Sequence, residues 1–479
     1  MEIWVIGGGL AGSEAAWQIA QQGGKVCLFE MRPAVKTAAH QTDWLGELVC
    51  SNSFKSDLEG SAPHQLKWEL RRCGSLLISI ADRVKVPAGA ALAVDREKFS
   101  QTISQTLQNH PSIRVERSEV VEIPAGQIAI IATGPLTSPG LSRFIKEMTG
   151  EAALYFYDAI SPIVESDSID WDKVFRRSRY DHRILEEKRR AESPQETGHS
   201  TETQHAACKQ AEVQQHADGD YVNCPMARDQ YERFYDALLH AESVAVKEFE
   251  KAMFFEACLP IEELARRGLD TLRFGPMKPV GLRDPRTGLQ PYAVVQLRQE
   301  NLVADAYNMV GFQNHLRYGE QQRVFRLIPG LERAEFIRLG QIHRNTFINA
   351  PRLLNRALQL KFRPEIYFAG QICGVEGYVE SMATGLVAGW NAMRVASGGN
   401  PLEFPRETAI GSLLHYITQA DSASFQPMNI NFGLLPPVEM RGKKEVRRAG
   451  QIALARQAME EFCKQRLQVA GRTSQVPSP

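Results

Sequence analysis

The sequence lacks any apolar run of the roughly 20 residues that a membrane-spanning helix needs. Its eight cysteines are scattered and include no CxxC pair, so we expect neither a zinc site nor a disulfide framework. Reduced thiols, and an apolar strand where a secretory signal would begin, favour a cytoplasmic protein. The formal net charge is zero, so a nucleic-acid partner would have to bind a local basic patch.

The amino-acid composition is that of an ordinary globular protein. The 479 residues are 43% hydrophobic and 23% charged, which is typical of a soluble chain with two or three domains. Its most informative stretch is the first 32 residues.

A dinucleotide-binding pattern opens the chain. Ile3–Ile6 predicts a buried strand and Ser13–Gln21 predicts a helix. Between them, Gly7, Gly9 and Gly12 have the GxGxxG spacing, which permits a tight turn, close approach of a pyrophosphate and close helix–strand packing. The alternative is an ordinary glycine-rich βα turn. The residues expected to contact the dinucleotide are Gly7, Gly8, Gly9, Leu10, Ala11 and Gly12.

An acidic residue ends the second predicted strand. Val26–Phe29 is apolar and is followed by Glu30, where a carboxylate accepts a hydrogen bond from a ribose 2′-hydroxyl. An acid rather than an arginine at this place favours FAD or NAD over NADP. Arg32 is included in the same predicted cofactor site.

Two later segments are typical of flavoproteins. Ile128–Ala132 runs into a Thr-Gly-Pro turn, which is either a simple turn or the return of the chain beside a cofactor. Glu365–Gln371 predicts a strand that ends in a glycine turn, and Ser381–Val395 a helix rich in small residues. This second pair resembles the flavin motif that holds the ribityl-phosphate end, with Gly370 and Gln371 as contacts. Gln371 departs from the acid usual there.

The pattern changes near Tyr155 and returns near Glu335, which predicts one domain interrupted by another. Residues 186–218 are polar and read as a disordered insertion, whose histidines and Cys208 indicate a solvated loop rather than a metal site. Further elements are predicted as strands at 113–122, 156–164 and 292–297 and helices at 65–77, 95–107, 229–240, 244–255 and 323–328. The predicted units are a first part at 1–154, an insertion domain at 155–334, a second part at 335–400, a helical segment at 401–465 and a tail at 466–479.

Polar stretches supply candidate chemistry. Cys50 lies in LVCSNSF and Cys224 in YVNCPM; each is either a nucleophilic thiol or a small buried hydrophobe. His343, Arg344 and Asn345 either grip a polar ligand or form a well-satisfied turn. Two basic clusters, at 441–448 and at Arg176, Arg177 and Arg179, are solvated surface or contacts to a phosphate backbone.

Taken together, these strings resemble the folate- and FAD-dependent tRNA (uracil-5-)-methyltransferase family, TrmFO. The segments that carry the resemblance are GGGLAGSEAAWQIA, ELVCSNSFKSD, YVNCPM, GFQNHLRYGEQ, HRNTFINAP and AGQICGVEGYVESMATG. The resemblance implies an α/β fold in which an FAD-binding Rossmann-type domain, of the glutathione-reductase-like kind, is interrupted by an α/β insertion domain. It also implies methylation of uridine 54 in the tRNA T-loop, with 5,10-methylenetetrahydrofolate as carbon donor and NADPH or NADH as reductant.

The resemblance also assigns roles to the candidate residues. Cys224 would be the nucleophile that adds to C6 of uracil and activates C5. Cys50 would remove the C5 proton or assist the transfer. His343, Arg344 and Asn345 would line the folate and flavin pocket. No metal ion is expected.

Three alternatives remain open at this point. One is the larger flavoprotein family that modifies the tRNA wobble uridine, whose chains have a longer C-terminal helical region. Another is an FAD-dependent oxidoreductase acting on small molecules. The third is a non-catalytic tRNA-binding chaperone that keeps FAD for structure.

Overall fold

The computed structural model describes residues 2–37, 39–151, 154–179, 219–244, 259–440 and 442–473. At 155–158, 342–344 and 466–473 only the backbone is described. The insertion predicted at 186–218 with its Cys208, nearly all of the helix predicted at 244–255 and the last six residues of the tail lie outside the described residues. Across the described chain, every helix is too short or too polar to span a bilayer.

A mostly parallel sheet carries the glycine-rich start of the chain. Its strands β1 and β7 are apolar because both faces are covered. Neighbouring strands are parallel except at the edge, where β16 is antiparallel to β17. The Rossmann-type α/β prediction is confirmed. In order across the sheet the strands are β16 (Gln359–Leu360), β17 (Arg363–Phe368), β7 (Ala129–Ile131), β1 (Glu2–Ile6), β2 (Lys25–Phe29) and β6 (Ile113–Glu116). The strand predicted at 113–122 therefore ends earlier, at Glu116.

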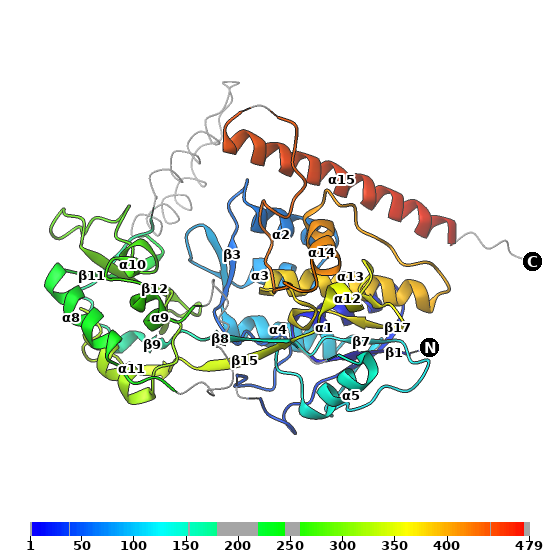
Figure 1. The fold of residues 1–479 in the computed structure, drawn as a ribbon, viewed down its shortest axis with the longest axis horizontal. Coiled ribbons are helices and arrows are strands. Elements are labelled where there is room, and N and C mark those ends of the chain that lie inside the picture. The colour runs from blue at the N-terminus through cyan, green and yellow to red at the C-terminus, as the bar shows by residue number, and fades with distance from the viewer. Residues whose placement is uncertain are drawn as a thin grey trace, which may run out of the picture.

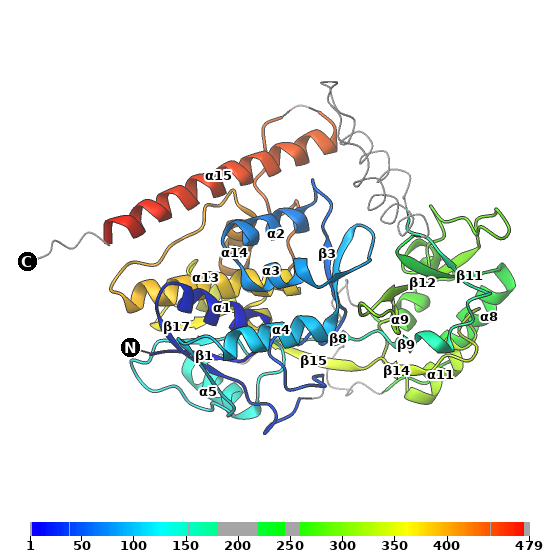
Figure 2. The ribbon, with the colours of Figure 1, turned by 180° about the vertical axis from the view of Figure 1, so that it is seen from behind.

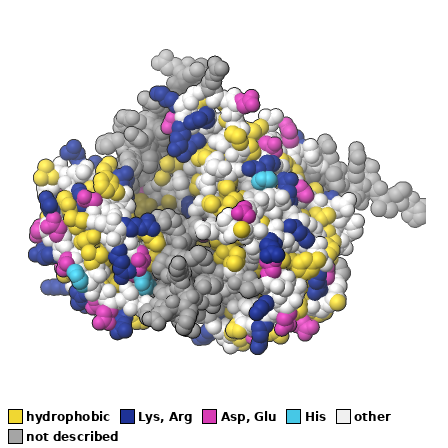
Figure 3. All heavy atoms as spheres, in the orientation of Figure 1, with side chains coloured by type: hydrophobic (Ala, Val, Ile, Leu, Met, Phe, Trp, Pro, Cys, Tyr) yellow, Lys and Arg dark blue, Asp and Glu magenta, His cyan; other side chains and the backbone are white. Residues whose placement is uncertain are grey.

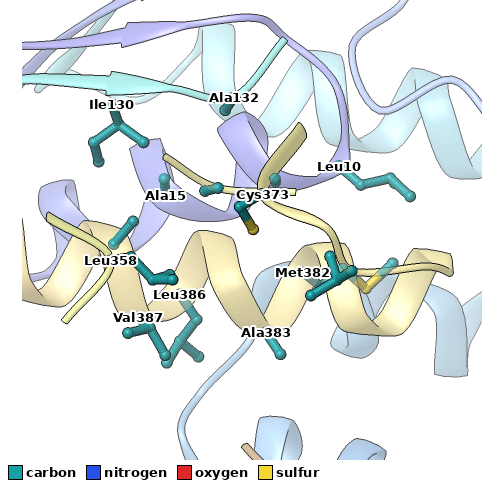
Figure 4. Packing of buried hydrophobic residues seen from close by; sticks show 14 of the residues in the cluster. Leu10, Ala15, Ile130, Ala132, Leu358, Cys373, Met382, Ala383, Leu386 and Val387 are labelled. Atoms are coloured by element: carbon teal, nitrogen blue, oxygen red, sulfur yellow. The ribbon is translucent and has the colours of Figure 1, made fainter. Parts of the chain in front are cut away.

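Two helices distant in sequence lie side by side against this sheet (Figure 4). α1 (Leu10–Gln21) and α13 (Tyr378–Ala396) approach so closely that a Cβ on Gly385 would lie 2.2 Å from the Ala11 carbonyl oxygen. A Cβ on Gly389 would lie 2.7 Å from the Ala15 carbonyl oxygen. The small residues predicted to allow close packing therefore serve the contact between these helices.

The helix predicted at 65–77 is wrong, because the structure divides it. α2 (Ala62–Arg72) ends before Gly74, whose φ of +74° is incompatible with helix continuation. Ser75 then starts α3 (Leu76–Arg83) by accepting a hydrogen bond from the Ile78 N–H. By contrast, the helix predicted after an Asp95 cap is confirmed as α4 (Arg96–Gln108).

Shorter elements complete this part of the molecule. β3 (Ser53–Ser56), β5 (Ala91–Val94) and β4 (Lys85–Val86) form a small antiparallel sheet. The long C-terminal helix lies across the helices of this part (Figures 1 and 2). The remaining helices are α5 (Pro139–Thr149), α12 (Ala350–Leu353), α14 (Ala409–Gln419), α15 (Lys444–Thr473) and the 3-10 turn η3 (Gln371–Cys373).

A second, antiparallel sheet has its own hydrophobic core. Its order is β10 (Phe175–Arg176), β11 (Tyr221–Met226), β12 (Ala293–Gln299), β13 (Ala306–Met309), β9 (Ile163–Glu165) and β14 (Phe336–Arg338). It packs with α8 (Arg228–Leu239), α9 (Ile261–Arg266), α10 (Thr271–Phe274) and α11 (Tyr318–Phe325), and η1 (Ser166–Ser168) follows β9. The helix predicted at 323–328 is placed too late, since α11 begins at Tyr318.

A two-stranded ribbon joins the two sheets (Figures 1 and 2). It pairs β8 (Leu154–Ala159) with β15 (Ile342–Phe347). The single strand predicted at 156–164 is wrong, because the chain leaves the ribbon before Pro162 and enters the second sheet as β9. The ribbon lies near the predicted boundaries at 155 and 335, although the division into domains remains a prediction.

Candidate functional site

A cavity lies at the carboxyl ends of β1, β2 and β7, where parallel α/β sheets bind ligands. The glycine-rich turn forms one wall, and the Thr-Gly-Pro turn after β7 forms another. The first turn of α13 and the loop before Cys50 close it. Its lining includes Gly7–Ala11, Glu30–Arg32, His40, Glu47, Val49, Ala132–Leu136, Gly370, Gln371, Tyr378 and Ser381.

The glycines leave an open cradle in this wall. Gly7 has a φ of +107°, and a Cβ there would lie 2.6 Å from the Ala132 carbonyl oxygen. A Cβ on Gly12 would lie 1.8 Å from the Gly7 carbonyl oxygen. Gly9 is different, because a Cβ there would meet no atom within 4 Å. Space is thus kept free beside the N-terminus of α1, which attracts an anion such as a pyrophosphate.

Glu30 and Arg32 form a buried ion pair in the cavity wall. Glu30 Oε1 accepts hydrogen bonds from Arg32 N and Nε at 3.0 and 2.9 Å. Oε2 accepts from Gly8 N and Arg32 Nη2 at 3.1 and 3.0 Å. Burial raises the pKa of Glu30, but hydrogen bonds and charge from Arg32 outweigh it, and the pKa is lowered overall. A ribose hydroxyl would have to share a carboxylate oxygen that already accepts two bonds.

Arg32 itself braces the loop above the cavity. Besides Glu30, its guanidinium donates to the Thr42 and Trp44 carbonyls and to Glu47 Oε2. These bonds use all five guanidinium donors. Arg32 therefore shapes the wall and has no donor left for a ligand.

The structure places Cys50 between this cavity and the second sheet. Its N–H donates to the Tyr378 hydroxyl at 2.8 Å, and Tyr378 lines the cavity. Its carbonyl accepts from Arg96 Nη2 at 3.0 Å, and Arg96 also pairs with Glu300 at 2.9 Å. Cys50 is half-buried, so its thiol lies at the edge of the site.

Cys224 lies elsewhere, in the core of the antiparallel sheet. It pairs with Val295 across β11 and β12 and is fully buried. Burial strongly raises the pKa of its thiol. The structure therefore does not bring Cys224 to the cavity, and in this arrangement its thiol is neither accessible nor ionised.

The segment His343, Arg344 and Asn345 lies on β15 of the connecting ribbon. Asn345 is buried, and the next residue, Thr346, donates its N–H to the Pro135 carbonyl in the cavity wall. The side chains of His343 and Arg344 lie outside the described part. The ribbon thus passes beside the cavity.

Sequence reasoning missed Asn52, which fixes the Cys50 loop to the second sheet. Its side-chain nitrogen donates to the Val94 and Gln299 carbonyls at 2.9 and 3.0 Å. Its oxygen accepts from Arg298 Nε at 2.9 Å. Asn52 is fully buried. An amide inside the CSNS string was the available signal, because a buried asparagine needs several partners.

The two basic clusters differ in exposure, because Arg176 is exposed whereas Arg177 and Arg179 are half-buried. The guanidinium of Arg176 lies over the rings of Trp171 and Tyr307, with its Cζ atom 5.4 and 5.8 Å from the two ring centroids. Residues 442–447 are exposed where α15 begins, and Figure 3 shows Lys and Arg side chains gathered at that end. Arg441 lies outside the described residues.

The parallel sheet, its glycine cradle and the second glycine turn at Gly370 define an FAD-binding Rossmann-type protein. The family model described as "Glucose inhibited division protein A" matches residues 2–209 and 190–400. The solved structure of GidA from Aquifex aeolicus superposes with a TM-score of 0.64 at 18% identity, covering 98% of this chain and 76% of that one; at this identity it shows the fold alone.

Relatives with much higher sequence identity show more specifically which family the chain belongs to. The methylenetetrahydrofolate–tRNA-(uracil-5-)-methyltransferase TrmFO of Koribacter versatilis is 54% identical, over 93% of both chains. The TrmFO proteins of Enterococcus faecalis and Heliobacterium modesticaldum are 51% and 53% identical, over 93% and 96% of this chain and 94% and 97% of their own. This chain belongs to the TrmFO family.

Proposed function

We infer that this protein methylates C5 of uridine 54 in the T-loop of tRNA. The carbon comes from 5,10-methylenetetrahydrofolate and the electrons from NADPH or NADH through FAD. The observation that carries this inference is the identity of more than half of the residues over nearly the whole length of TrmFO relatives. Such coverage leaves little room for a different active site, and the wobble-uridine alternative is not favoured.

The cavity fits FAD. The open space at Gly9 and the N-terminus of α1 would accept the pyrophosphate, and Glu30 would contact the ribose. Gly370 and Gln371, with the first turn of α13, would lie at the ribityl-phosphate end. FAD supplies the redox chemistry that converts the transferred carbon into a methyl group.

The chain's own contribution to catalysis is thiol and base chemistry. A thiolate that adds to C6 of uracil makes C5 nucleophilic. C5 then bonds to the one-carbon unit as the bond between that carbon and its carrier nitrogen breaks, and the nitrogen keeps the electron pair. A base must take the C5 proton, and expulsion of the thiolate restores the ring. The position of Cys50 beside Tyr378 supports a role for its thiol at the reacting base. The role of Cys224 as nucleophile remains a prediction, and it requires the side chain to leave the core.

The partners follow from this reaction. They are tRNA, the folate, the nicotinamide dinucleotide and FAD, and we propose a cytoplasmic location because tRNA is modified there. His343, Arg344 and Asn345 are proposed to bind the folate, since their strand passes the cavity wall at Pro135.

The decisive test is nucleoside mass spectrometry. An unmodified tRNA transcript is incubated with the FAD-loaded protein, NADPH and isotope-labelled methylenetetrahydrofolate. We expect labelled 5-methyluridine at position 54, and a transcript with cytidine at that position should remain unlabelled. Absence of label with a flavin that NADPH reduces would contradict the proposal and favour a small-molecule oxidoreductase.

A further inference from the structure

A second cavity, of about 540 Å³, lies between elements packed around the parallel sheet and elements of the antiparallel part. Its size is that of a typical small-ligand site. One side comes from the loop that Arg32 braces and from α4, and the other from α11, β14 and the segment that leads into β15. The lining is Gln41, Thr42, Trp44, Glu47, Arg96, Glu97, Ser100, Ile163, Tyr318, Phe336, Ile337, Arg338, Leu339 and Gln341.

Arg338 is the unusual residue in this cavity. It is half-buried, and the hydrogen bond that the structure gives its side chain runs from Nη2 to the Ala39 carbonyl at 3.3 Å. Among the described residues it has no carboxylate within ion-pair distance. Burial lowers the pKa of Arg338, and the neighbouring Arg96 lowers it further. A half-buried guanidinium in this situation is stabilised by an anion from outside.

The carboxylates that line the cavity compensate the charge of Arg338 only in part, because Glu47 raises the pKa of Arg338 but burial and Arg96 outweigh it. Glu47 accepts from Arg32 Nη1, from the Gln41 and Thr42 N–H groups and from the Thr42 hydroxyl. Glu97 is exposed to solvent, which screens its charge.

Arg96 connects this cavity to Cys50. Its guanidinium donates to the Leu48 and Cys50 carbonyls and pairs with Glu300. A ligand that contacts Arg338 would therefore lie close to the Cys50 loop. The first cavity also reaches this loop, at Val49 and Tyr378, and Glu47 lines both cavities.

Resting on the proposed function, we propose that Arg338 binds a backbone phosphate of the tRNA next to the target uridine. A guanidinium binds phosphate through paired N–H donors. The half-buried Trp44 and Phe336 offer apolar surface to an unstacked base, as single-stranded RNA requires. The rim residues Tyr318 and Ile337 are 53% and 59% exposed, so a continuous strand can enter and leave the cavity. Arg338 is thus a positioning residue for the base at Cys50.

The test compares Arg338→Gln and Arg338→Lys with a matched control, Arg333→Gln. Arg333 is exposed and has no ion pair among the described residues. All proteins are loaded with FAD, and binding of an unmodified tRNA transcript is measured over a range of salt concentrations. We expect Arg338→Gln to weaken binding about tenfold and to reduce the slope of log K against log salt by about one. Arg338→Lys should restore much of the affinity.

Turnover kinetics separates the alternatives. For Arg338→Gln we expect a raised KM for tRNA and an unchanged KM for methylenetetrahydrofolate, with unchanged flavin content and melting temperature. A raised KM for the folate with unchanged tRNA binding would overturn the proposal and assign Arg338 to a folate carboxylate. Unchanged values for both substrates would overturn it as well. Failure of the wild-type protein to methylate tRNA would instead reject the proposed function.

Discussion

Cys50 and Cys224 have similar sequence surroundings and opposite structural ones. Cys50 lies on a loop at the edge of the parallel part, beside Tyr378 and Arg96. Cys224 lies within a strand of the antiparallel part, with its thiol sealed in a core. The difference teaches that a thiol's chemistry depends on the element that carries it, since a loop can leave an atom accessible and a central strand buries it.

The same contrast separates the two sheets. The parallel sheet ends its strands in turns at one edge and leaves a cavity there. The antiparallel sheet uses its inner face for a continuous apolar core. The second cavity is lined by β14 and by Ile163 on β9 of this sheet, and by the neighbouring helix α11.

The largest effect is expected at the glycine cradle. Gly12→Ala would drive a Cβ into the Gly7 carbonyl, so we expect loss of bound FAD and destabilisation by about 1–3 kcal/mol. Gly9→Ala fits the protein itself and should keep the melting temperature while lowering FAD affinity. The control is Gly319→Ala on α11, where a Cβ also meets no atom within 4 Å. Flavin absorbance and thermal unfolding report both quantities; full flavin in Gly9→Ala would contradict the pyrophosphate placement.

The next effect concerns the two thiols. We expect Cys50→Ala to lower methylation about 100-fold or more while FAD content and stability stay near wild type. For Cys224→Ala, lost turnover in a folded, FAD-loaded protein would support the nucleophile predicted from the family resemblance. Full turnover would remove that role. Tritium release from C5 of labelled tRNA, measured for both variants, shows which step each thiol serves.

A smaller difference is expected between the rates at which iodoacetamide alkylates the thiols. Half-buried Cys50 should react with the native protein within the time in which Cys224 and Cys373 remain unlabelled. Cys373 belongs to the parallel part, yet burial raises its pKa to about 12. Peptide mapping before and after unfolding assigns each thiol. Fast labelling of native Cys224 would show that its core opens and that its thiol is as accessible as that of Cys50.

The smallest expected effect concerns the pKa values of two buried carboxylates in the parallel part, which are shifted in opposite directions. Arg32 lowers the pKa of Glu30, whereas burial raises the pKa of Glu69 to about 7. A raised folded-state pKa means that Glu69 costs stability as pH rises from about 4.5 to 7. The melting temperature of wild type relative to Glu69→Gln should therefore fall over that range. A constant difference would show that the Glu69 contacts to Ala409 and Ile410 keep it ionised throughout.

Local patterns predicted the strand, glycine turn and helix at the start of the parallel sheet, because these signals are short-range, whereas the Rossmann-type fold as a whole was implied by the family resemblance. The strand–turn–helix start and the Asp95 cap each lie within a few residues. The break at Gly74 was missed since the apolar spacing continues across it. Asn52, Arg96 and Arg338 were missed as site residues because their roles depend on Gln299, Cys50 and a cavity shared by distant segments. No local spacing encodes such contacts.

The contact between α1 and α13 also affects how the protein is made. Gln18 accepts a hydrogen bond from Trp390, 372 residues further along the chain. At a synthesis rate of about 5–20 residues per second, the first helix emerges from the ribosome roughly 20 seconds or more before its partner. During that interval the apolar side of α1 has no α13 to cover it. The apolar side of α1 therefore waits for a segment made near the end of synthesis before it reaches its native burial.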